Sequence, residues 1–326
     1  MRILSRQEIE ELIDIGEIAS LMEEVFVAVT EKKVLIPERI VFTKDRAEDS
    51  VLFMPGYLKS TDGIGVKVVS VFPSNARRGV PTIAAQILLN DAETGAVRAI
   101  LDGTYITALL TAATTAVATK YLAREDASRL GIFGAGVQGQ EQVKAHCRLR
   151  PLDSIVVFDP IAEKAQALAS QSREWCGDSV GINAAKDPND LLSQCDIIIT
   201  ATTSQSPVFD GAHLKPGTHI NAIGSYKPRV REVDDVTIQR SRIAVDSYEH
   251  ALKEAGDLIH PLRRGILNET DILAELGELV LRRKTVRRTP EDITFFKCVG
   301  LAVQDIAVAQ RVLEKAERNN VGTVVS

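Results

Sequence analysis

The chain has 326 residues, enough for about two domains of ordinary size. Of these residues 45% are hydrophobic and 25% are charged, which is typical of folded globular chains and excludes intrinsically disordered and collagen-like proteins. The net charge of -5 argues against a surface that binds nucleic acid or acidic lipid, so we expect neither nucleic acid nor a membrane as partner.

The cysteine pattern and the first residues bear on the cellular compartment. The four cysteines lie far apart and form no C-x-x-C pair and no Cys/His cluster; they are Cys147, Cys176, Cys195 and Cys298. We therefore expect reduced thiols, with neither a disulfide framework nor a metal site. The N-terminal residues turn acidic at Glu8 and lack the apolar stretch of a signal peptide. Together these features predict a cytoplasmic protein.

The first part of the chain reads as two helices followed by a β-rich block. Residues 3–33 carry apolar side chains at helical spacing, and the interruption at Gly16 predicts two consecutive helices. Apolar or β-branched runs predict strands at 40–42, 50–54, 65–71 and 83–89. Residues 91–95 are typical of a hairpin connection to a further strand at 97–100. An alanine- and threonine-rich helix is predicted at about 104–123.

From residue 129 strands and helices alternate, which predicts a parallel sheet covered on both faces. Strands are predicted at 130–133, 154–158, 181–184, 197–200, 219–222 and 242–245, and helices at about 138–150 and 161–175. A C-terminal amphipathic helix at 300–319 is expected to pack on the first domain. The predicted fold class is α/β, with a Rossmann-type doubly wound sheet at 125–295 inserted into a split α+β domain of residues 1–124 and 296–326.

The most informative motif follows the first strand of this sheet. Gly134, Ala135, Gly136, Val137 and Gln138 begin a G-x-G-x-x-G pattern placed directly before a helix, where backbone N–H groups bind the pyrophosphate of a dinucleotide. Asp159 ends the next strand, where a carboxylate accepts hydrogen bonds from ribose hydroxyls and repels a 2′-phosphate. We therefore expect NAD(H) to be favoured over NADP(H). A tight turn without a ligand is the alternative.

Two later strands end at the same edge of the predicted sheet. Their polar ends are expected to line the nicotinamide half of the cofactor site, because ligands of open α/β sheets lie beyond the carboxyl ends of the strands. The alternative is that the hydroxyl groups only cap the following helices. The residues are Thr202, Thr203 and Ser204 after the strand at 197–200, and Asn221, Ala222 and Ile223 at the strand of 219–222.

With these motifs in place, the chain resembles the ornithine cyclodeaminase/mu-crystallin family over nearly its full length. The matching segments are Gly65-Val66-Lys67, Gly79-Val80-Pro81-Thr82, Leu89 to Gly95, Thr107 to Thr114, Gly134 to Gln138, Thr218 to Gly224 and Gly300 to Asp305. The family includes cyclodeaminases of ornithine and lysine, an archaeal-type alanine dehydrogenase, cyclic-imine reductases and binding proteins. The resemblance implies a homodimer formed through the split domain, with substrate held between that domain and the Rossmann domain. It also implies that Thr82, Thr111 and Cys298 contact the cofactor.

The shared chemistry of this family is hydride transfer between nicotinamide and the α-carbon of an amino acid, through an imine. Arg39 and Lys67 match the family's carboxylate-binding cations, and Lys67 is the predicted catalytic proton donor. Independently of the resemblance, a lysine inside an apolar strand must face either solvent or a polar cleft. An ordinary solvent-facing side chain is the alternative for both cations.

At two positions the chain departs from the family pattern. Leu110 stands where the family typically has an arginine that touches the substrate carboxylate. Tyr226 stands where cyclodeaminases and the alanine dehydrogenase carry an aspartate that handles the substrate amine, whereas Val299 matches a position bordering the substrate. Reduction of a ready-made imine needs mainly a hydride and a proton donor. The sequence therefore predicts an NAD(P)H-dependent imine or ketimine reductase, with Tyr226 as a second candidate for the proton donor. Two alternatives stay open: amino-acid deamination of the cyclodeaminase or alanine dehydrogenase type, and a non-catalytic nucleotide-dependent binding protein.

Overall fold

In a computed structural model, which describes residues 1–43 and 49–325, the chain divides into two compact units. Unit 1 comprises Met1–Leu110 and Gly300–Ser326, and unit 2 comprises Thr111–Val299. One boundary falls inside helix α3 (Gly103–Leu122). The sequence analysis placed the two boundaries at 124/125 and 295/296, whereas the contact-defined units meet at 110/111 and 299/300. Among the described residues no helix is both long and apolar enough to cross a membrane.

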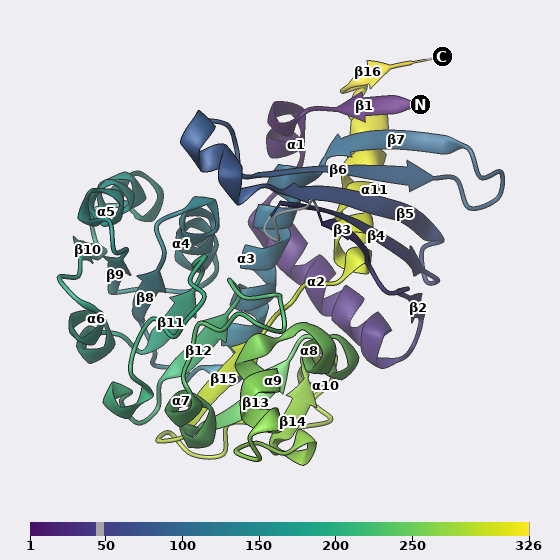
Figure 1. The fold of residues 1–326 in the computed structure, drawn as a ribbon. Coiled ribbons are helices and arrows are strands. Elements are labelled where there is room, and N and C mark those ends of the chain that lie inside the picture. The colour runs from purple at the N-terminus through teal and green to yellow at the C-terminus, as the bar shows by residue number, and fades with distance from the viewer. Residues whose placement is uncertain (44–48, 326) are drawn as a thin grey trace. The chain divides into compact units, whose positions relative to one another are not determined.

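Unit 1 is built on one mixed sheet (Figure 1). Its order is β16-β1-β7-β6-β5-β4-β2, with β3 also paired to β4, and both described chain ends lie at the β1–β16 edge. The pair β1–β7 is parallel and the other pairs are antiparallel. The strands are β1 (Arg2–Leu4), β2 (Val34–Leu35), β3 (Ile40–Thr43), β4 (Ser50–Leu58), β5 (Gly63–Val71), β6 (Ile83–Asn90), β7 (Val97–Asp102) and β16 (Thr323–Val324). The helices are α1 (Arg6–Leu12), α2 (Ile15–Thr30), a 3₁₀-helix (Pro73–Arg78) and α11 (Ala302–Asn319).

Within unit 1, helices cover one face of this sheet, and the opposite face also carries apolar side chains. Alternate side chains of β4, β5 and β6 are buried, and α11 packs on these three strands and on α2. The buried set includes Leu52, Met54, Ile87 and Leu89. Since successive strand residues point to opposite faces, their neighbours in sequence face away from α11. Both faces of the sheet therefore carry apolar side chains.

The helical break near the N-terminus does not lie where the sequence predicted it. Ser5 caps α1 through a capping box with Glu8, and Asp14 caps α2 by accepting from the Gly16 N–H. Gly16 therefore lies inside the first turn of α2, and the prediction of a break at Gly16 was wrong. Asp14 fixes the start of α2 because its side chain accepts from a backbone N–H that has no partner within the helix. A single glycine in the first turn is not enough to end a helix.

Unit 2 contains an entirely parallel sheet with strand order β10-β9-β8-β11-β12-β15-β13-β14. Apolar clusters lie on both faces, so the doubly wound arrangement predicted from the alternating pattern is confirmed. The strands are β8 (Arg129–Phe133), β9 (Ser154–Phe158), β10 (Gly181–Ala184), β11 (Ile197–Thr200), β12 (His219–Ala222), β13 (Ser241–Val245), β14 (Ile272–Glu275) and β15 (Ile293–Lys297). The helices are α4 (Val137–Leu149), α5 (Ala162–Cys176), α6 (Pro188–Gln194), α7 (Asp235–Arg240), α8 (Tyr248–Glu254), α9 (Gly256–Arg263) and α10 (Leu276–Val280), with 3₁₀-helices at Gly211–His213 and Glu269–Asp271.

The sequence analysis predicted no strand in the part of the chain that forms β14 and β15. Strand β15 nevertheless lies between β12 and β13, and all five of its residues are buried. A short apolar run that ends in a lysine has no period of its own, so only its pairing on both sides identifies it as a strand.

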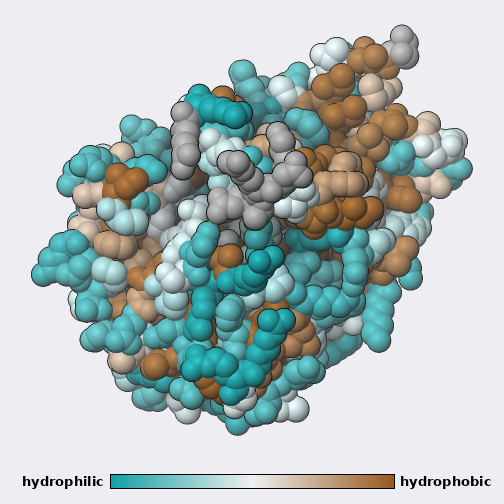
Figure 2. Space-filling view, viewed as in Figure 1, coloured by the Kyte–Doolittle hydropathy of each residue, from teal (hydrophilic) through white to brown (hydrophobic). Residues whose placement is uncertain are grey.

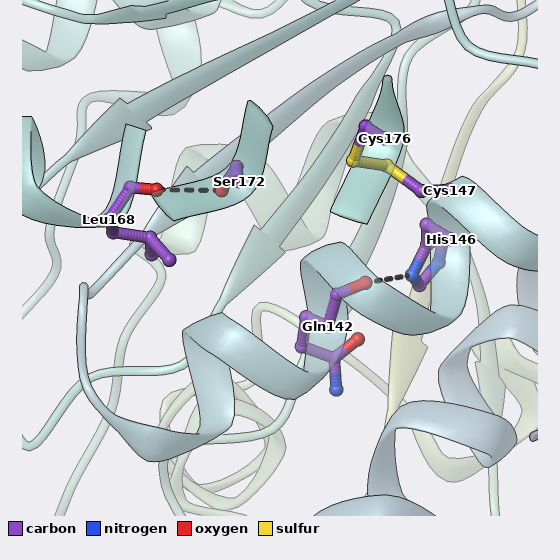
Figure 3. Close-up of a disulfide and its surroundings, with 6 residues drawn as sticks. All are labelled: Gln142, His146, Cys147, Leu168, Ser172 and Cys176. Carbon is purple, nitrogen blue, oxygen red and sulfur yellow. Dashed lines mark hydrogen bonds between the residues drawn. A yellow bond between two sulfur atoms is a disulfide. The ribbon is translucent and has the colours of Figure 1, made fainter. Parts of the chain in front are cut away.

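The cysteine prediction needs a correction, because Cys147 and Cys176 form a disulfide with a Cα–Cα distance of 5.5 Å (Figure 3). Cys147 lies near the end of α4 and Cys176 is the last residue of α5. The two helices pack on each other, which brings together cysteines that are far apart in sequence. Cys195 and Cys298 are buried free thiols. The expectation of a cytoplasmic location rested partly on four reduced thiols, and the disulfide removes that support.

Candidate functional site

The glycine-rich loop after β8 has the conformation of a dinucleotide-binding turn. Gly134 has φ +99°, and a side chain there would lie 2.6 Å from the carbonyl oxygen of Ala201, which follows β11. A side chain at Gly139 would overlap the carbonyl oxygen of Gly134. The first and last glycines of the motif are thus required by the backbone. They bring the loops after β8 and β11 together at the point where the strand order reverses, which is where such sheets bind ligands.

The middle of the same loop is open toward a ligand. Gly136 precedes the first turn of α4, no side chain caps that turn, and a side chain at Gly136 would meet nothing within 4 Å. Val137 is exposed, whereas the amide oxygen of Gln138 is buried with no hydrogen-bond partner among the described residues. Uncapped N–H groups at a helix start attract phosphate. The residues present therefore fit the pyrophosphate of a dinucleotide.

Asp159 lies just after β9 and holds the glycine loop from the side. One carboxylate oxygen accepts from the Ala135 N–H at 3.0 Å and the other from the Ile161 N–H at 2.9 Å. Each oxygen retains a second lone pair. The carboxylate is therefore fixed beside the loop and still has the capacity to accept a ribose hydroxyl.

The loops after β11 and β12 are joined by Glu232, a residue that sequence reasoning missed. Its fully buried carboxylate accepts hydrogen bonds from both hydroxyls and backbone N–H groups, and burial raises its pKa. The donors are the hydroxyl of Thr200 (2.9 Å), the N–H and hydroxyl of Thr202 (both 2.8 Å), and the N–H groups of Gly224 (2.7 Å) and Ser225 (3.2 Å). No local pattern marks this glutamate, because its partners come from two separate strand ends.

A second buried group supports Glu232 from behind. Asp257 accepts from the N–H groups of Glu232 (2.6 Å) and Val233 (3.1 Å), and its other oxygen accepts from the Ser225 hydroxyl (2.5 Å) and from Lys297 (2.8 Å). Burial by itself would raise the pKa of Asp257, but Lys297, Ser225 and the Glu232 N–H together hold it below its usual value. The predicted edge of the nicotinamide site thus rests on a fully buried polar network.

The other predicted residues of this edge differ in exposure. Thr203 is exposed, Ile223 is partly buried, and the Ser204 hydroxyl donates to the Ser206 carbonyl at 2.7 Å. Asn221 and Ala222 are fully buried; the Asn221 amide donates to the Thr119 hydroxyl at 3.0 Å, and its oxygen has no partner among the described residues. The Asn221 side chain thus packs in the interior of unit 2.

Four further predicted residues belong to unit 2. Thr111 and Tyr226 are partly buried, and the Lys227 ammonium lies 5.6 Å from the centre of the Tyr226 ring. Cys298 and Val299 follow β15 and are buried; their N–H groups donate to the Ala222 carbonyl at 3.2 Å and to the Asp246 carboxylate at 2.7 Å. These last contacts hold the end of β15 in place.

In unit 1 the predicted catalytic lysine is buried rather than exposed. Lys67 points to the covered face of the sheet, where its ammonium lies 2.6 Å from a carboxylate oxygen of Asp305 on α11. The Thr107 hydroxyl on α3 donates to the other oxygen of Asp305 at 3.2 Å and lies 3.4 Å from the ammonium. Burial raises the pKa of Asp305, although Lys67, Thr107 and Arg39 oppose the shift. The sequence analysis expected either solvent or a polar cleft around Lys67, but it did not identify Asp305 as the partner.

The remaining predicted residues of unit 1 lie on neighbouring elements. Arg39 precedes β3, is partly buried, and donates to the Gly300 carbonyl at 3.1 Å. Leu110 is buried on α3, one turn after Thr107. Thr82 directly precedes β6, and its carbonyl accepts from the Phe72 N–H at 2.7 Å.

Comparison with known proteins gives a consistent result along the whole chain. The sequence profile of the ornithine cyclodeaminase/mu-crystallin family matches residues 1–320. A delta(1)-pyrroline-2-carboxylate reductase of Bacillus cereus is 35% identical over 323 residues, which cover 99% of this chain and 98% of the relative. The structure of the Thermococcus litoralis delta(1)-pyrroline-2-carboxylate reductase in complex with NADH and L-proline is 39% identical, covers 100% of both chains and has a TM-score of 0.96.

A second solved structure has a different activity. It is an archaeal alanine dehydrogenase dimer with bound NAD, 33% identical, which covers 100% of this chain and 99% of its own, with a TM-score of 0.92. The family match covers residues of both units. The chain belongs to the ornithine cyclodeaminase/mu-crystallin family.

Proposed function

We propose that this protein is an NAD(H)-dependent imine reductase that acts on a small cyclic α-imino acid of the delta(1)-pyrroline-2-carboxylate class. The observation that carries the proposal is the buried ammonium of Lys67 beside Asp305 and Thr107, in a chain similar throughout to a reductase solved with NADH and L-proline. A buried lysine paired with a carboxylate is a proton donor in a defined position. The reaction adds a hydride to the imine carbon and a proton to the imine nitrogen, giving a cyclic amino acid.

Unit 2 supplies the proposed cofactor site. The N–H groups after Gly136 bind the pyrophosphate, and Asp159 accepts from the adenosine ribose. NADH, when bound, supplies the hydride. The negative charge of Asp159 repels the 2′-phosphate of NADPH, so we propose a preference for NAD(H). The Glu232 network keeps the loops after β11 and β12 in position for the nicotinamide half.

Unit 1 supplies the proposed substrate groups. Arg39 binds the α-carboxylate. Lys67 contacts the substrate as the proton donor: its ammonium gives a proton to the imine nitrogen, and the neutral amine then regains one from water. Leu110, which is buried, stands where the family typically has a third cation. With tyrosine rather than a carboxylate at Tyr226, the chain has no evident base at that position for withdrawing a proton from an amine, which favours imine reduction over amino-acid deamination.

We further propose that two copies of the chain associate through the face of the unit 1 sheet opposite α11. Two large apolar side chains there are more than half exposed, Phe42 (63%) and Ile40 (56%), both on β3. Figure 2 shows apolar residues gathered over the strands of unit 1. Exposed apolar surface of this kind marks an interface. A dimeric mass in sedimentation equilibrium supports the proposal, and Phe42→Asp should shift the mass to a monomer.

The test of the activity is NADH consumption with delta(1)-pyrroline-2-carboxylate, its six-membered-ring homologue, and pyruvate with ammonia, each repeated with NADPH. We expect turnover of a cyclic imine, with NADH preferred, and formation of the cyclic amino acid. Lys67→Ala should abolish turnover and leave the dissociation constant for NADH unchanged. Tight NADH binding without turnover of any substrate would indicate a binding protein, whereas ammonia released from ornithine or alanine would indicate a deaminase.

A further inference from the structure

The start of helix α11 holds both cations that we assign to the substrate. Gly300, two residues before α11, accepts from Arg39 through its carbonyl, and Asp305 in the first turn of the helix pairs with Lys67. Thr107 on α3 contacts both Lys67 and Asp305. One short segment of the chain thus fixes groups that come from two separate parts of the sheet.

The Lys67–Asp305 pair is in an unusual position for an ion pair. On the covered face of the sheet, Lys67 lies between Met54 of β4 and Ile87 of β6, both buried and apolar. The side chains of Lys67 and Asp305 are only 7% and 2% exposed. A buried ion pair gains little stability over an apolar pair of similar volume, because both charges lose their hydration. Stability therefore does not account for a charged pair at this position.

The number of hydrogen bonds at the lysine points to a third partner. An ammonium has three N–H donors. The described residues supply Lys67 with two partners, the Asp305 carboxylate and the Thr107 hydroxyl. The charged groups that act here are Asp305 from α11 and Arg39 from the segment before β3, while β4 and β6 contribute apolar side chains. Among the described residues, one N–H of the ammonium therefore has no acceptor.

We propose that Asp305 is a positioning residue for the proton donor Lys67: its carboxylate fixes the ammonium and directs the remaining N–H toward the substrate imine. The inference rests on the proposed function, in which Lys67 donates that proton. During turnover an N–H bond of Lys67 breaks and an N–H bond forms on the imine nitrogen. The neutral amine of Lys67 then takes a proton from water. Asp305 keeps its negative charge throughout and favours that last step.

The test is Asp305→Asn, assayed in the intact protein with NADH and delta(1)-pyrroline-2-carboxylate. We expect kcat to fall roughly 10- to 100-fold, because a displaced donor no longer reaches the imine in the right geometry. The KM for delta(1)-pyrroline-2-carboxylate should change much less than kcat, because Asp305 acts on the proton donor and not on substrate binding. The dissociation constant for NADH should stay unchanged.

A matched control removes another carboxylate that pairs with α11. Glu17 on α2 lies 2.9 Å from Arg311 and also contacts Lys315, both on α11 and away from Lys67. Glu17→Gln should leave both kcat and KM as in the wild type. If Asp305→Asn behaves like this control while Lys67→Ala is inactive, Asp305 does not position the donor. If Lys67→Ala itself keeps full turnover, the proposed function fails at its proton donor.

A second variant separates positioning from folding. Lys67→Met with Asp305→Leu replaces the ion pair by two apolar side chains. We expect this double variant to fold, to unfold at a temperature equal to or above that of the wild type, and to bind NADH without turnover. This result would support the proposal even if Asp305→Asn alone does not fold. A double variant that fails to fold would instead assign the pair to stability and overturn the proposal.

Discussion

The ammonium of Lys297 lies 2.8 Å from a carboxylate oxygen of Asp257, and neither side chain has any exposed surface. Lys297 ends β15, and its ammonium also donates to the Ser225 hydroxyl at 3.0 Å. Asp257 in turn accepts from the backbone of Glu232, whose carboxylate holds the loops after β11 and β12. The Lys297–Asp257 pair therefore links β15 to the loops after β11 and β12, where we propose that the cofactor binds.

Loss of Lys297 should destabilise unit 2 strongly. Lys297→Met leaves the charge of Asp257 buried without its cation, which costs about 3–5 kcal/mol of the free energy of unfolding. Urea denaturation measures the change. Lys253→Met is the control, because Lys253 and its partner Glu249 are both exposed and such pairs contribute little. Equal stability of the two variants would show that Lys297 and Asp257 do not form this pair in solution.

Glu232→Gln should weaken NADH binding as well as stability. The amide has the same shape, but its NH₂ group would face one of the donors that now bind the carboxylate, either from Thr202 or from Gly224 and Ser225. A buried donor left without an acceptor costs roughly 1–3 kcal/mol. Fluorescence titration with NADH should show weaker binding than in Glu249→Gln, an exposed control. Unchanged binding would separate Glu232 from the cofactor site.

Removal of the Cys147–Cys176 disulfide should lower stability without affecting turnover. The bridge spans a sequence separation of 29, for which the loop-entropy relation gives roughly 3–4 kcal/mol. The double variant Cys147→Ser/Cys176→Ser should unfold at a lower temperature, and dithiothreitol should lower the unfolding temperature of the wild type only. A thiol titration that finds four free cysteines in the denatured wild type would contradict the bridge.

Acid should destabilise the protein through its buried histidines. Burial lowers the pKa of His146 to about 4 and that of His219 to about 3, from a usual value of 6.5. In the unfolded chain these histidines gain protons below pH 6.5, whereas in the folded protein they stay neutral until far lower pH. The unfolded state thus binds more protons. As the pH falls from 6.5 toward the pKa in the folded protein, each histidine therefore lowers the free energy of unfolding by about 1.4 kcal/mol per pH unit.

The hydrogen bonds of His146 are consistent with a neutral ring. Its Nδ1 lies 2.9 Å from the Gln142 carbonyl (Figure 3) and therefore carries the hydrogen. Nε2 then accepts from the Thr119 hydroxyl at 3.2 Å. In His146→Gln, the slope of the free energy of unfolding against pH between about 4 and 6.5 should be smaller than in the wild type. A slope in His146→Gln equal to that of the wild type would mean that His146 gains its proton equally in the folded and unfolded states.

The features that the sequence predicted correctly are local ones. The alternation of strands and helices after residue 129 and the glycine motif at Gly134 need only neighbouring residues to be recognised, and both are present in the structure. The family resemblance likewise rests on short segments, and the profile match over residues 1–320 agrees with it. Strand β15 and the disulfide were missed because each depends on a partner distant in the chain.

The amino-acid sequence by itself thus determined the fold class, the family and the cations Arg39 and Lys67 as candidates, since periodicity and motifs are written in adjacent positions. Only the tertiary structure decided which groups hold these residues. Asp305 meets Lys67 because α11 packs on β5, and Glu232 gathers donors from two strand ends because β11 and β12 are neighbours. A buried charge is stable only beside its partner, and the fold alone selects that partner.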